Sequence, residues 1–374
     1  MKKVLFFVES LHCGGAERSL LSLLNNLDYT GYDVHLMVAK RGGEFEKFVP
    51  KHLQIESIEV NLSLFSRLKF KALRFFDKKK KYHKAQLYWQ SVKSDIPVAP
   101  GKYDIAVSWG QGFATYFVAE KVTADKKLAW VNIDYKKAGY VWERDLPLYN
   151  KFYKVVGVSE FVKEAMQEFL PKEKVIAIRN IIDPDDILLR AKEPMSFAYD
   201  KDYTNIVSVG RLAKQKGFEL AVEAVDYLVK KGLKVRWYII GEGSERSYLE
   251  ELIAAKNVQE NLILLGFRDN PYPYIAASDI YAQTSWFEGL GRTIIEAGIL
   301  CKPIVTTNFP TAHAILEHDK TGLIVEMDAA IIGKAVAGII ENDQLRSKLV
   351  QNLQAQSDNE KQKTLEKVSQ LFKS

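Results

Sequence analysis

The segment Ser285–Ala297 holds the residue types with the clearest chemical potential. Glu288 and Glu296 are separated by seven residues, and two glycines lie between them. The run of residues 292–300 predicts a helix, whose first amides and positive dipole end suit a phosphate or a sugar hydroxyl. Glu296 can accept hydrogen bonds from vicinal hydroxyls such as those of a ribose. The segment therefore predicts a cradle for a nucleotide sugar, although a glutamate pair at this spacing also occurs on solvated helix faces.

Two cations and a glycine pair offer matching chemistry. Arg211 directly follows the apolar run Asn205–Gly210, and Lys216 comes five residues later. Ligands of open α/β sheets bind beyond the carboxyl ends of strands, so both cations can neutralise a pyrophosphate there. Near the start of the chain, the amides of Gly14 and Gly15 can approach a diphosphate closely because glycine lacks Cβ. The alternatives are ordinary surface charges and a tight turn.

Length and composition bound the fold. The chain has 374 residues, 47% of them hydrophobic and 27% charged, which fits a globular protein with two cores. Cys13 and Cys301 are the only cysteines, so we expect no disulfide framework and a reducing compartment. The apolar run after Met1 is broken by Glu9, too early for a signal peptide. No apolar run is long enough to predict a membrane span.

Strand-like and helix-like segments alternate along the whole chain. This pattern predicts parallel sheets with helical crossovers, in two successive doubly wound domains. A Pro- and Asp-rich break near Asp183 sets the expected domains at residues 1–182 and 183–354, and a last helix over about 355–374 is expected to pack back onto the first. The first domain carries a net charge of +10, whereas residues 183–374 carry −4, so the two halves should meet different partners. The expected strands are 4–8, 33–39, 55–60, 105–109, 128–132, 154–158 and 175–179, then 205–210, 234–241, 262–266, 280–283 and 303–307.

Several motifs in register carry a resemblance to a known family. They are Cys13-Gly14-Gly15-Ala16-Glu17-Arg18, Val158-Ser159-Glu160, Arg179-Asn180-Ile181-Ile182-Asp183, Val209-Gly210-Arg211-Leu212 with Lys216-Gly217, Ile240-Gly241-Glu242-Gly243, Leu265-Gly266-Phe267, the Glu288/Glu296 segment and Lys320-Thr321-Gly322-Leu323. Together they resemble the retaining glycosyltransferases of family 4, the group 1 glycosyltransferases of bacterial surface-polysaccharide type. The resemblance covers nearly the whole chain and implies a GT-B fold, in which two Rossmann-like domains face each other across a cleft.

The resemblance also implies roles for the motif residues. Arg211, Lys216 and Glu288 would be catalytic: the two cations stabilise the leaving nucleotide diphosphate, and Glu288 holds sugar hydroxyls. No metal is expected to take part, and no cofactor beyond the nucleotide-sugar donor. The expected substrate-binding residues are Gly14, Gly15, Asn132, Asp134, Gly266, Phe267, Gly289, Leu290, Gly291, Thr293 and Glu296.

One departure from the family pattern affects the first domain. Many relatives carry a histidine after a late strand, near the sugar, but here Asn132 stands at that position. Asparagine donates and accepts hydrogen bonds but does not titrate near neutral pH. Asn132 and Asp134 can still contact the acceptor or the transferred sugar, or they serve only as turn residues at the end of a strand.

The segment of residues 67–84 is strongly basic, with nine Lys or Arg against one Asp. Phe65, Leu68, Ala72, Phe75 and Phe76 recur at helical spacing, so the segment predicts a basic helix with an aromatic face. Such a helix can lie on an anionic membrane surface. Nucleic acid and the protein's own domain are the alternative partners. We favour the membrane, with no nucleic acid.

The expected activity is transfer of a sugar from a nucleotide-diphosphate donor, best a UDP-sugar, with retention of configuration. The expected acceptor is a lipid-linked or growing glycan of capsule or exopolysaccharide type, reached by a cytoplasmic enzyme peripheral to the inner face of the cell membrane. Two alternatives stay open. A sugar-nucleotide epimerase could share the fold, and a non-catalytic partner subunit could keep the fold without the donor site.

Overall fold

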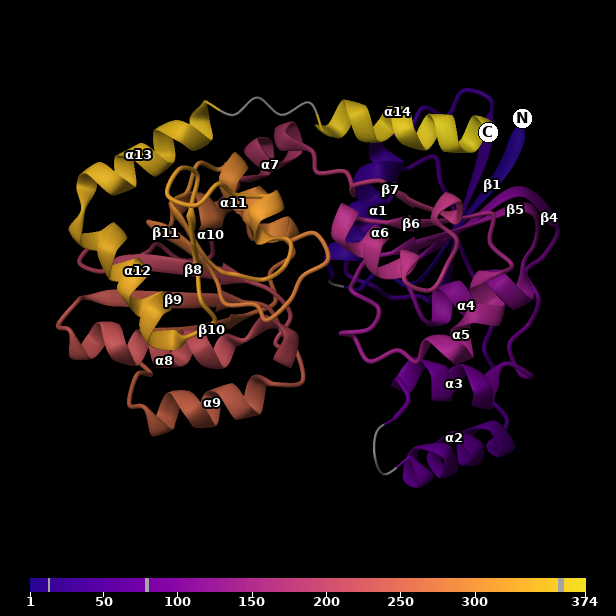
Figure 1. Ribbon diagram of the computed structural model, residues 1–374, viewed down its shortest axis with the longest axis horizontal. Coiled ribbons are helices and arrows are strands. Elements are labelled where there is room, and N and C mark those ends of the chain that lie inside the picture. The colour runs from indigo at the N-terminus through magenta and orange to yellow at the C-terminus, as the bar shows by residue number, and fades with distance from the viewer. Residues whose placement is uncertain (13, 78–80, 356–359) are drawn as a thin grey trace. The chain divides into compact units, whose positions relative to one another are not determined.

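Two parallel β-sheets organise the chain, one in each of two units (Figure 1). The computed structural model describes residues 1–12, 14–77, 81–355 and 360–374. The first unit runs from Met1 to Ile181 and includes the last helix, and the second begins at Ile182. The sequence analysis set this boundary between residues 182 and 183. The expected α/β class with two doubly wound parallel sheets is confirmed.

The sheet of the first unit has the strand order β3-β2-β1-β4-β5-β6-β7, and every neighbouring pair is parallel. The order reverses between β1 and β4, which is where open α/β sheets form their ligand crevice. The strands are β1 (Lys2–Ser10), β2 (Tyr32–Lys40), β3 (Ile55–Ser57), β4 (Lys102–Trp109), β5 (Thr123–Val131), β6 (Lys154–Gly157) and β7 (Val175–Ala177).

The helices of the first unit include one from the far end of the sequence. They are α1 (Gly15–Asn26), α2 (Leu64–Phe76), α3 (Lys84–Val92), α4 (Phe113–Lys121), α5 (Trp142–Tyr149), α6 (Glu160–Gln167) and α14 (Glu360–Lys373). The ring of Phe372 on α14 is fully buried and lies 6.1 Å from the ring of Phe6 on β1. Lys2 Nζ donates a 3.0 Å hydrogen bond to the Phe372 carbonyl oxygen. These contacts attach α14 to the first unit.

The second unit has a six-stranded parallel sheet with the order β10-β9-β8-β11-β12-β13. Its order reverses between β8 and β11. The strands are β8 (Thr204–Val209), β9 (Val235–Ile240), β10 (Leu262–Gly266), β11 (Ile280–Gln283), β12 (Ile304–Thr307) and β13 (Leu323–Val325). The helices are α7 (Pro184–Arg190), α8 (Phe218–Lys230), α9 (Arg246–Ala255), α10 (Tyr272–Ala277), α11 (Arg292–Ile299), α12 (Ala329–Glu341) and α13 (Asp343–Gln354).

Burial explains why the central strands are continuous apolar runs. All side chains from Val4 to Val8 are at most 2% exposed, because helices cover both faces of the parallel sheet. Polar residues mark where helices begin. Ser159 caps α6 by accepting a hydrogen bond from the Val162 amide, and Asp328 caps α12 by accepting one from the Ile331 amide.

The basic segment differs from its prediction. The helix over this region is α2, which ends at Phe76, and the Asp77 carboxylate then accepts hydrogen bonds from the amides of Lys81 and Tyr82. The prediction of one helix over residues 67–84 is therefore wrong. A side chain that accepts hydrogen bonds from the backbone amides after it favours a non-helical turn, so the helix does not continue. Lys78, Lys79 and Lys80, which belong to the expected membrane segment, lie outside the described residues, as does Cys13 of the glycine motif.

Candidate active site

Lys216 and Glu288 form an ion pair beyond the carboxyl ends of β8 and β11. Lys216 Nζ lies 2.6 Å from Glu288 Oε1, and the side chains are 17% and 10% exposed. The two strands flank the point where the strand order of this sheet reverses. The sequence analysis assigned Lys216 to the diphosphate and Glu288 to sugar hydroxyls. The two side chains are in fact paired, at the place where a ligand is expected.

A buried polar network fixes the Glu288 carboxylate. Its Oε1 also accepts hydrogen bonds from Gln283 Nε2 at 2.7 Å and from Ser285 Oγ at 2.6 Å. Gln283 Oε1 in turn accepts from Thr293 Oγ1 at 2.7 Å. Oε2 of Glu288 accepts no hydrogen bond from any residue that the structure describes. The network holds one oxygen and leaves the other able to accept a hydroxyl from a ligand.

The loop that carries Lys216 is tied to the loop that carries Glu288. Thr284 Oγ1 donates to the Lys216 carbonyl oxygen at 3.0 Å, and the Trp286 amide donates to the Gln215 carbonyl oxygen at 2.9 Å. Gly217 makes this approach possible, since its φ is +58° and a Cβ there would lie 2.2 Å from the Thr284 carbonyl oxygen. The glycine of the Lys216-Gly217 motif is therefore required by the backbone contact.

Arg211 is exposed at the start of the loop after β8. Its guanidinium makes no hydrogen bond or ion pair with the described residues. The neighbouring backbone is closely packed: the Leu212 amide donates to the Glu242 carbonyl oxygen, and a Cβ on Gly241 would lie 1.9 Å from the Gly210 carbonyl oxygen. A fixed backbone with a solvated guanidinium suits recognition of an anion by Arg211.

Glu296 on α11 is almost entirely buried, with 2% of its surface exposed. Its Oε1 accepts hydrogen bonds from Arg292 Nε at 2.7 Å and from Tyr272 OH at 3.0 Å. Among the described residues, Oε2 has no hydrogen-bond partner. Arg292 and Tyr272 therefore orient the carboxylate, and one of its oxygens remains to accept hydroxyl hydrogens.

The start of α11 follows directly after Glu288. No side chain caps this helix start, and its N-cap, Gly291, has a φ of +67°. Gly289, Leu290 and Gly291 are buried, and the Thr293 hydroxyl is already bonded to Gln283. The glycine motif thus presents backbone at a helix N-terminus, where partial positive charge accumulates.

The loop after β10 borders the same edge of the sheet. The Gly241 amide donates to the Gly266 carbonyl oxygen at 2.9 Å, and Gly266 has a φ of +74°. Phe267 is half-buried, and its carbonyl oxygen accepts from Arg268 Nη1 at 2.9 Å. The loop thus places backbone polar groups of Gly266 and Phe267 beside those of the β9 loop.

In the first unit, Gly14 and Gly15 lie between β1 and α1 as expected. Gly14 is the N-cap of α1, and no side-chain hydrogen bond caps the helix there. The Glu17 carboxylate folds back over this start, because a Cβ on Gly14 would lie 2.0 Å from Glu17 Oε2. A phosphate that bound these amides would have to displace Glu17, which the sequence analysis did not anticipate.

Asn132 and Asp134 have different surroundings. The side-chain oxygen Oδ1 of Asn132 accepts a hydrogen bond from Asn180 Nδ2 at 2.8 Å, and the backbone N–H of Asn132 donates to Gln111 Oε1 at 3.2 Å. The buried side-chain nitrogen Nδ2 of Asn132 has no partner among the described residues. Asp134 Oδ1 accepts from the amides of Lys136 and Lys137 and so closes its own turn. Asn132 thus retains a donor for a ligand, whereas the Asp134 carboxylate is committed to the turn.

The sequence analysis missed the residues that position the two glutamates. Gln283, Ser285, Tyr272 and Arg292 contact Glu288 or Glu296 directly. Arg292 at i−4 from Glu296 had a signal in its spacing, because both lie on the expected helix, whereas Ser285 lies in a loop, where i−3 spacing gives no signal. Tyr272 is remote in sequence and had none. Within the described ranges, no three His, Cys, Asp or Glu side chains are grouped so that they could hold a metal ion.

Comparisons with known proteins add independent information. Residues 190–356 match the family model of the glycosyl transferases group 1. An N-acetylgalactosamine-N,N'-diacetylbacillosaminyl-diphospho-undecaprenol 4-alpha-N-acetylgalactosaminyltransferase of Campylobacter jejuni is 29% identical over 356 residues, which cover 92% of each chain.

Two solved structures are similar over essentially the whole chain. A point mutant of Staphylococcus aureus TarM, in complex with Fondaparinux, alpha-GlcNAc-glycerol and UDP, has a TM-score of 0.73 at 14% identity and covers 100% of both chains. Anabaena HepE in complex with UDP-glucose has a TM-score of 0.73 at 19% identity and covers 99% of this chain and 100% of its own. At these identities the likeness shows the fold, and the GT-B resemblance is confirmed on the level of architecture.

Proposed function

The chain is a glycosyltransferase whose residues 190–356 belong to group 1, and from this premise we propose that it transfers a sugar from a nucleotide diphosphate with retention of configuration. The observation that carries the proposal is the Lys216–Glu288 ion pair, with Arg211 on the same loop as Lys216. The bond between sugar and phosphate breaks in such a donor. Arg211 and Lys216 can bind the phosphates, and the Glu288 carboxylate can accept hydrogen bonds from sugar hydroxyls.

In this proposal the cations act on the leaving group. Negative charge grows on the nucleotide diphosphate as its bond to the sugar breaks. Arg211 offers a planar fork to phosphate oxygens, and Lys216 adds a positive charge that Glu288 holds in place. Backbone of residues 289–293 at the start of α11 adds partial positive charge, and the amides of Gly14 and Gly15 are further candidates.

The carboxylates act on hydroxyls. Glu288 Oε2 would accept a hydrogen bond from a hydroxyl of the transferred sugar, and Glu296 Oε2 would accept hydrogen bonds from the ribose hydroxyls. In each glutamate, Oε1 already accepts hydrogen bonds within the protein. The backbone groups of Gly266 and Phe267 would meet the base. In the first unit, Asn132 would contact the sugar or the acceptor through its unpaired Nδ2, whereas Asp134 would support that loop.

Retention requires attack on the face from which the diphosphate leaves. The two hydroxyls that lie beside carboxylates in the described site, those of Ser285 and Tyr272, are fully buried and already donate to Glu288 and Glu296. We therefore propose that no side chain attacks the sugar, and we assign the acceptor's proton to the leaving phosphate. A UDP-sugar is the donor favoured by similarity, because HepE was solved with UDP-glucose and TarM with UDP. No metal ion or cofactor has a role in the proposed chemistry.

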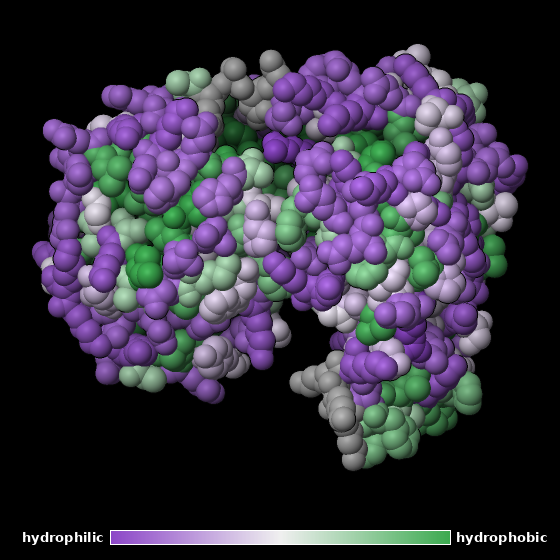
Figure 2. Space-filling model, viewed as in Figure 1, coloured by the Kyte–Doolittle hydropathy of each residue, from purple (hydrophilic) through white to green (hydrophobic). Residues whose placement is uncertain are grey.

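The proposed acceptor is a lipid-linked or growing glycan of the cell surface. The Campylobacter jejuni relative is named for a diphospho-undecaprenol substrate, which supports this class. On α2, the side chains of Leu64, Phe65, Leu68 and Phe76 are 72%, 71%, 55% and 77% exposed, and Figure 2 shows apolar residues gathered over this helix. An exposed apolar face among cations fits the anionic inner surface of the cell membrane, where the enzyme would be peripheral.

No helix in the described part of the chain combines the length and apolar character that spanning a bilayer requires. A peripheral contact through α2 needs no such helix. Among the described residues, α2 carries Arg67, Lys69, Lys71 and Arg74 beside its exposed rings. This combination of apolar and cationic side chains favours a lipid surface over nucleic acid as the partner.

Donor binding tests the proposal directly. A panel of UDP-, GDP-, ADP- and dTDP-sugars should yield one donor that raises the thermal midpoint of the purified chain, because a ligand that prefers the folded state stabilises it. Slow hydrolysis of that donor, with retained configuration at the released sugar, would separate an active enzyme from a non-catalytic partner subunit. Recovery of an epimerised sugar nucleotide would favour an epimerase instead. Absence of both binding and hydrolysis would overturn the proposal.

A further inference from the structure

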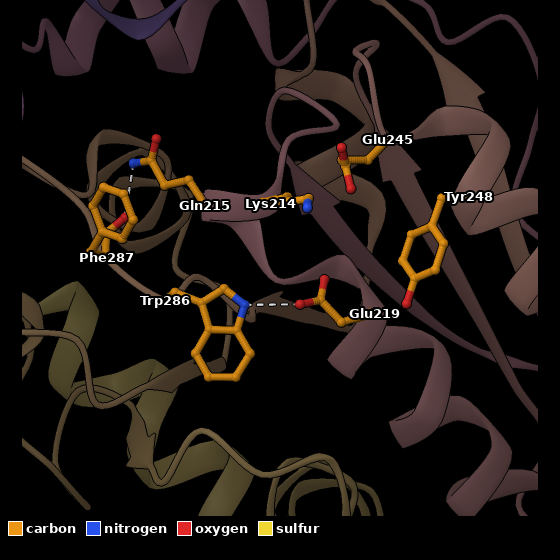
Figure 3. A pocket seen from close by; sticks show the side chains of 7 residues that line it. All are labelled: Lys214, Gln215, Glu219, Glu245, Tyr248, Trp286 and Phe287. Carbon is orange, nitrogen blue, oxygen red and sulfur yellow. Dashed lines mark hydrogen bonds between the residues drawn. The ribbon is translucent and has the colours of Figure 1, made fainter. Parts of the chain in front are cut away.

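A pocket lies in the second unit, apart from the carboxylate network described above. It has a volume of about 770 Å³ and is formed by the loops after β8, β9 and β11 together with the first turns of α8 and α9 (Figure 3). Trp286 and Phe287 border it on one side and Tyr248 on the other, with polar side chains between them. None of these side chains was assigned a role in the proposed reaction.

The aromatic walls of this pocket are exposed and partly fixed. Trp286 is 38% exposed and Tyr248 is 50% exposed, although large rings are usually more buried. Trp286 Nε1 donates to Glu219 Oε1 at 2.9 Å, and its backbone amide donates to the Gln215 carbonyl oxygen. The indole ring is therefore held in one orientation before any ligand arrives, which reduces the entropy that binding would cost.

Polar groups in the pocket remain available. Within the described chain, Lys214 Nζ and the Glu245 carboxylate have no hydrogen bond or ion pair, and Glu219 uses only one of its oxygens. The Gln215 amide nitrogen donates to the Phe287 carbonyl oxygen at 2.8 Å, which leaves its own oxygen free to accept. Donors and acceptors thus face one space that is walled by rings.

This chemistry selects a class of ligand. Two carboxylates and one ammonium give the lining a net negative charge, which disfavours phosphates, sulfates and uronic acids. Rings with apolar faces stack on the C–H faces of other rings, and carboxylates accept hydrogen bonds from hydroxyls. An uncharged pyranose presents both features, an apolar ring face and a rim of hydroxyls.

We propose that this pocket, here called the aromatic pocket, is a binding subsite for uncharged sugar units of a glycan, separate from the donor site. The idea that these units belong to the acceptor rests on the proposed function, whereas the binding itself does not. The short helix Lys214–Lys216 joins the two sites: Lys214 and Gln215 line the aromatic pocket, and Lys216 pairs with Glu288. A glycan held there would lie next to the loop that carries the catalytic lysine.

Binding of free trisaccharides to the full chain tests the inference. The probes are maltotriose, cellotriose and N,N',N''-triacetylchitotriose, with trigalacturonic acid as the charged comparison. Their binding is measured by saturation-transfer NMR and calorimetry. We expect at least one neutral trisaccharide to bind with a Kd of about 1 mM or below, and trigalacturonic acid to bind more weakly. No nucleotide is added, so the outcome does not depend on donor turnover.

Three variants locate the site. Tyr248→Ala removes a half-exposed ring on α9 and should weaken binding by at least about five-fold, the middle of the range for a ring contact. Tyr153→Ala removes a ring of similar exposure in the first unit, 44%, and should not change it. Lys216→Ala should strongly reduce donor turnover and keep trisaccharide binding. Absence of neutral binding at about 20 mM, a smaller effect of Tyr248→Ala, or equal binding of trigalacturonic acid would overturn the aromatic pocket's role.

Discussion

The ammonium of Lys216 lies 2.6 Å from the carboxylate of Glu288, although the two residues are 72 positions apart in the sequence. The pair is mostly shielded from water, so its attraction is stronger than that of a surface pair. Removal of either partner leaves a poorly solvated charge without compensation. The proposed electrostatic and hydroxyl-binding roles therefore depend on each other, and their variants should not be additive.

Lys216→Ala should lower kcat by about 10²–10³, the usual effect of removing one preorganised electrostatic group. The donor Kd should change less, because charge on the leaving diphosphate is larger in the transition state than in the bound donor. Steady-state kinetics beside calorimetric donor binding separate the two quantities. Lys230→Ala is the control, since its 2.8 Å pair with Asp226 lies on an exposed helix face. Normal kcat in Lys216→Ala would remove this lysine from the reaction.

Glu296→Ala should weaken donor binding by about 1.5–3 kcal/mol, the range for hydrogen bonds to a charged group. Tyr272→Phe should weaken it less, because this hydroxyl orients Glu296 Oε1 without reaching the donor in the proposed arrangement. Calorimetry with the nucleoside diphosphate and with its 2'-deoxy analogue identifies the contact. If Glu296→Ala binds both compounds as the parent protein does, the ribose is held elsewhere.

Activity should survive dialysis against EDTA. Arg211 and Lys216 are proposed to supply the positive charge that a divalent ion would otherwise place on the diphosphate. Transfer or donor hydrolysis is measured before and after dialysis, with metal content followed by mass spectrometry. Activity that is lost with EDTA and returns with magnesium or manganese would contradict the assignment of the leaving-group charge to these two side chains.

Replacement of Lys78, Lys79, Lys80 and Lys81 by glutamine should weaken binding to anionic vesicles by up to about 4 kcal/mol, since each lysine near such a surface contributes roughly 1 kcal/mol. Flotation with phosphatidylglycerol vesicles at low and high salt measures it. Replacement of Lys230, Lys231, Lys234 and Lys256 in the second unit by glutamine is the charge-matched control. Equal loss in both variants would indicate a general charge effect, and no binding by the parent protein would make α2 a surface for another partner.

Asp145→Asn should change how stability depends on pH. Burial raises the pKa of this carboxyl above its usual value, although hydrogen bonds from Tyr135, Tyr116 and Gln86 lower it. The folded state therefore binds the proton more tightly than the unfolded state. This contribution to the free energy of unfolding is full below the unfolded pKa of 3.8 and is lost as pH rises through the raised folded pKa.

Denaturant titrations of parent and variant at a series of pH values give the difference to compare. The parent should lose stability relative to Asp145→Asn as pH rises above about 4. Asp95→Asn provides a control of opposite sign, because the nearby Ser66 hydroxyl and hydrogen bonds from the amide and hydroxyl of Ser63 lower the pKa of Asp95. Its contribution is present above the unfolded pKa and is lost as pH falls. A pH-independent difference for Asp145→Asn would show that burial does not control this group.

Much of the fold could be predicted because buried parallel strands are apolar on both faces. The run Val4–Val8 lies inside β1, which extends two residues further at each end, and the run Ile280–Gln283 coincides with β11. The apolar spacing ends at Phe76, where α2 also ends, but the lysine-rich sequence that follows extended the expected helix beyond this point. The Asp77 carboxylate instead binds two later amides. A local hydrogen bond decided that boundary.

The sequence predicted the residue types of the candidate site better than it predicted the side chains that hydrogen-bond to them. Arg211, Lys216, Glu288 and Glu296 follow strands or lie on a helix in a recognisable order, and whether they bind a donor stays a prediction. The contact of Tyr272 with Glu296 depends on packing of α10 against α11, which no local spacing encodes. Asp134 had a local signal, since an aspartate in a turn can accept the amides of the residues that follow it, here Lys136 and Lys137.

The contact of Phe6 with Phe372 has a consequence for synthesis on the ribosome. All parts of the second unit lie within one continuous stretch, so its sheet can form as soon as that stretch has been made. The first unit needs α14 to cover Phe6, and Lys2 and Phe372 are 370 residues apart. The unit translated first is thus the one completed last. Until α14 emerges, the apolar surface around Phe6 and Tyr32 lacks its native cover and is open to chaperones.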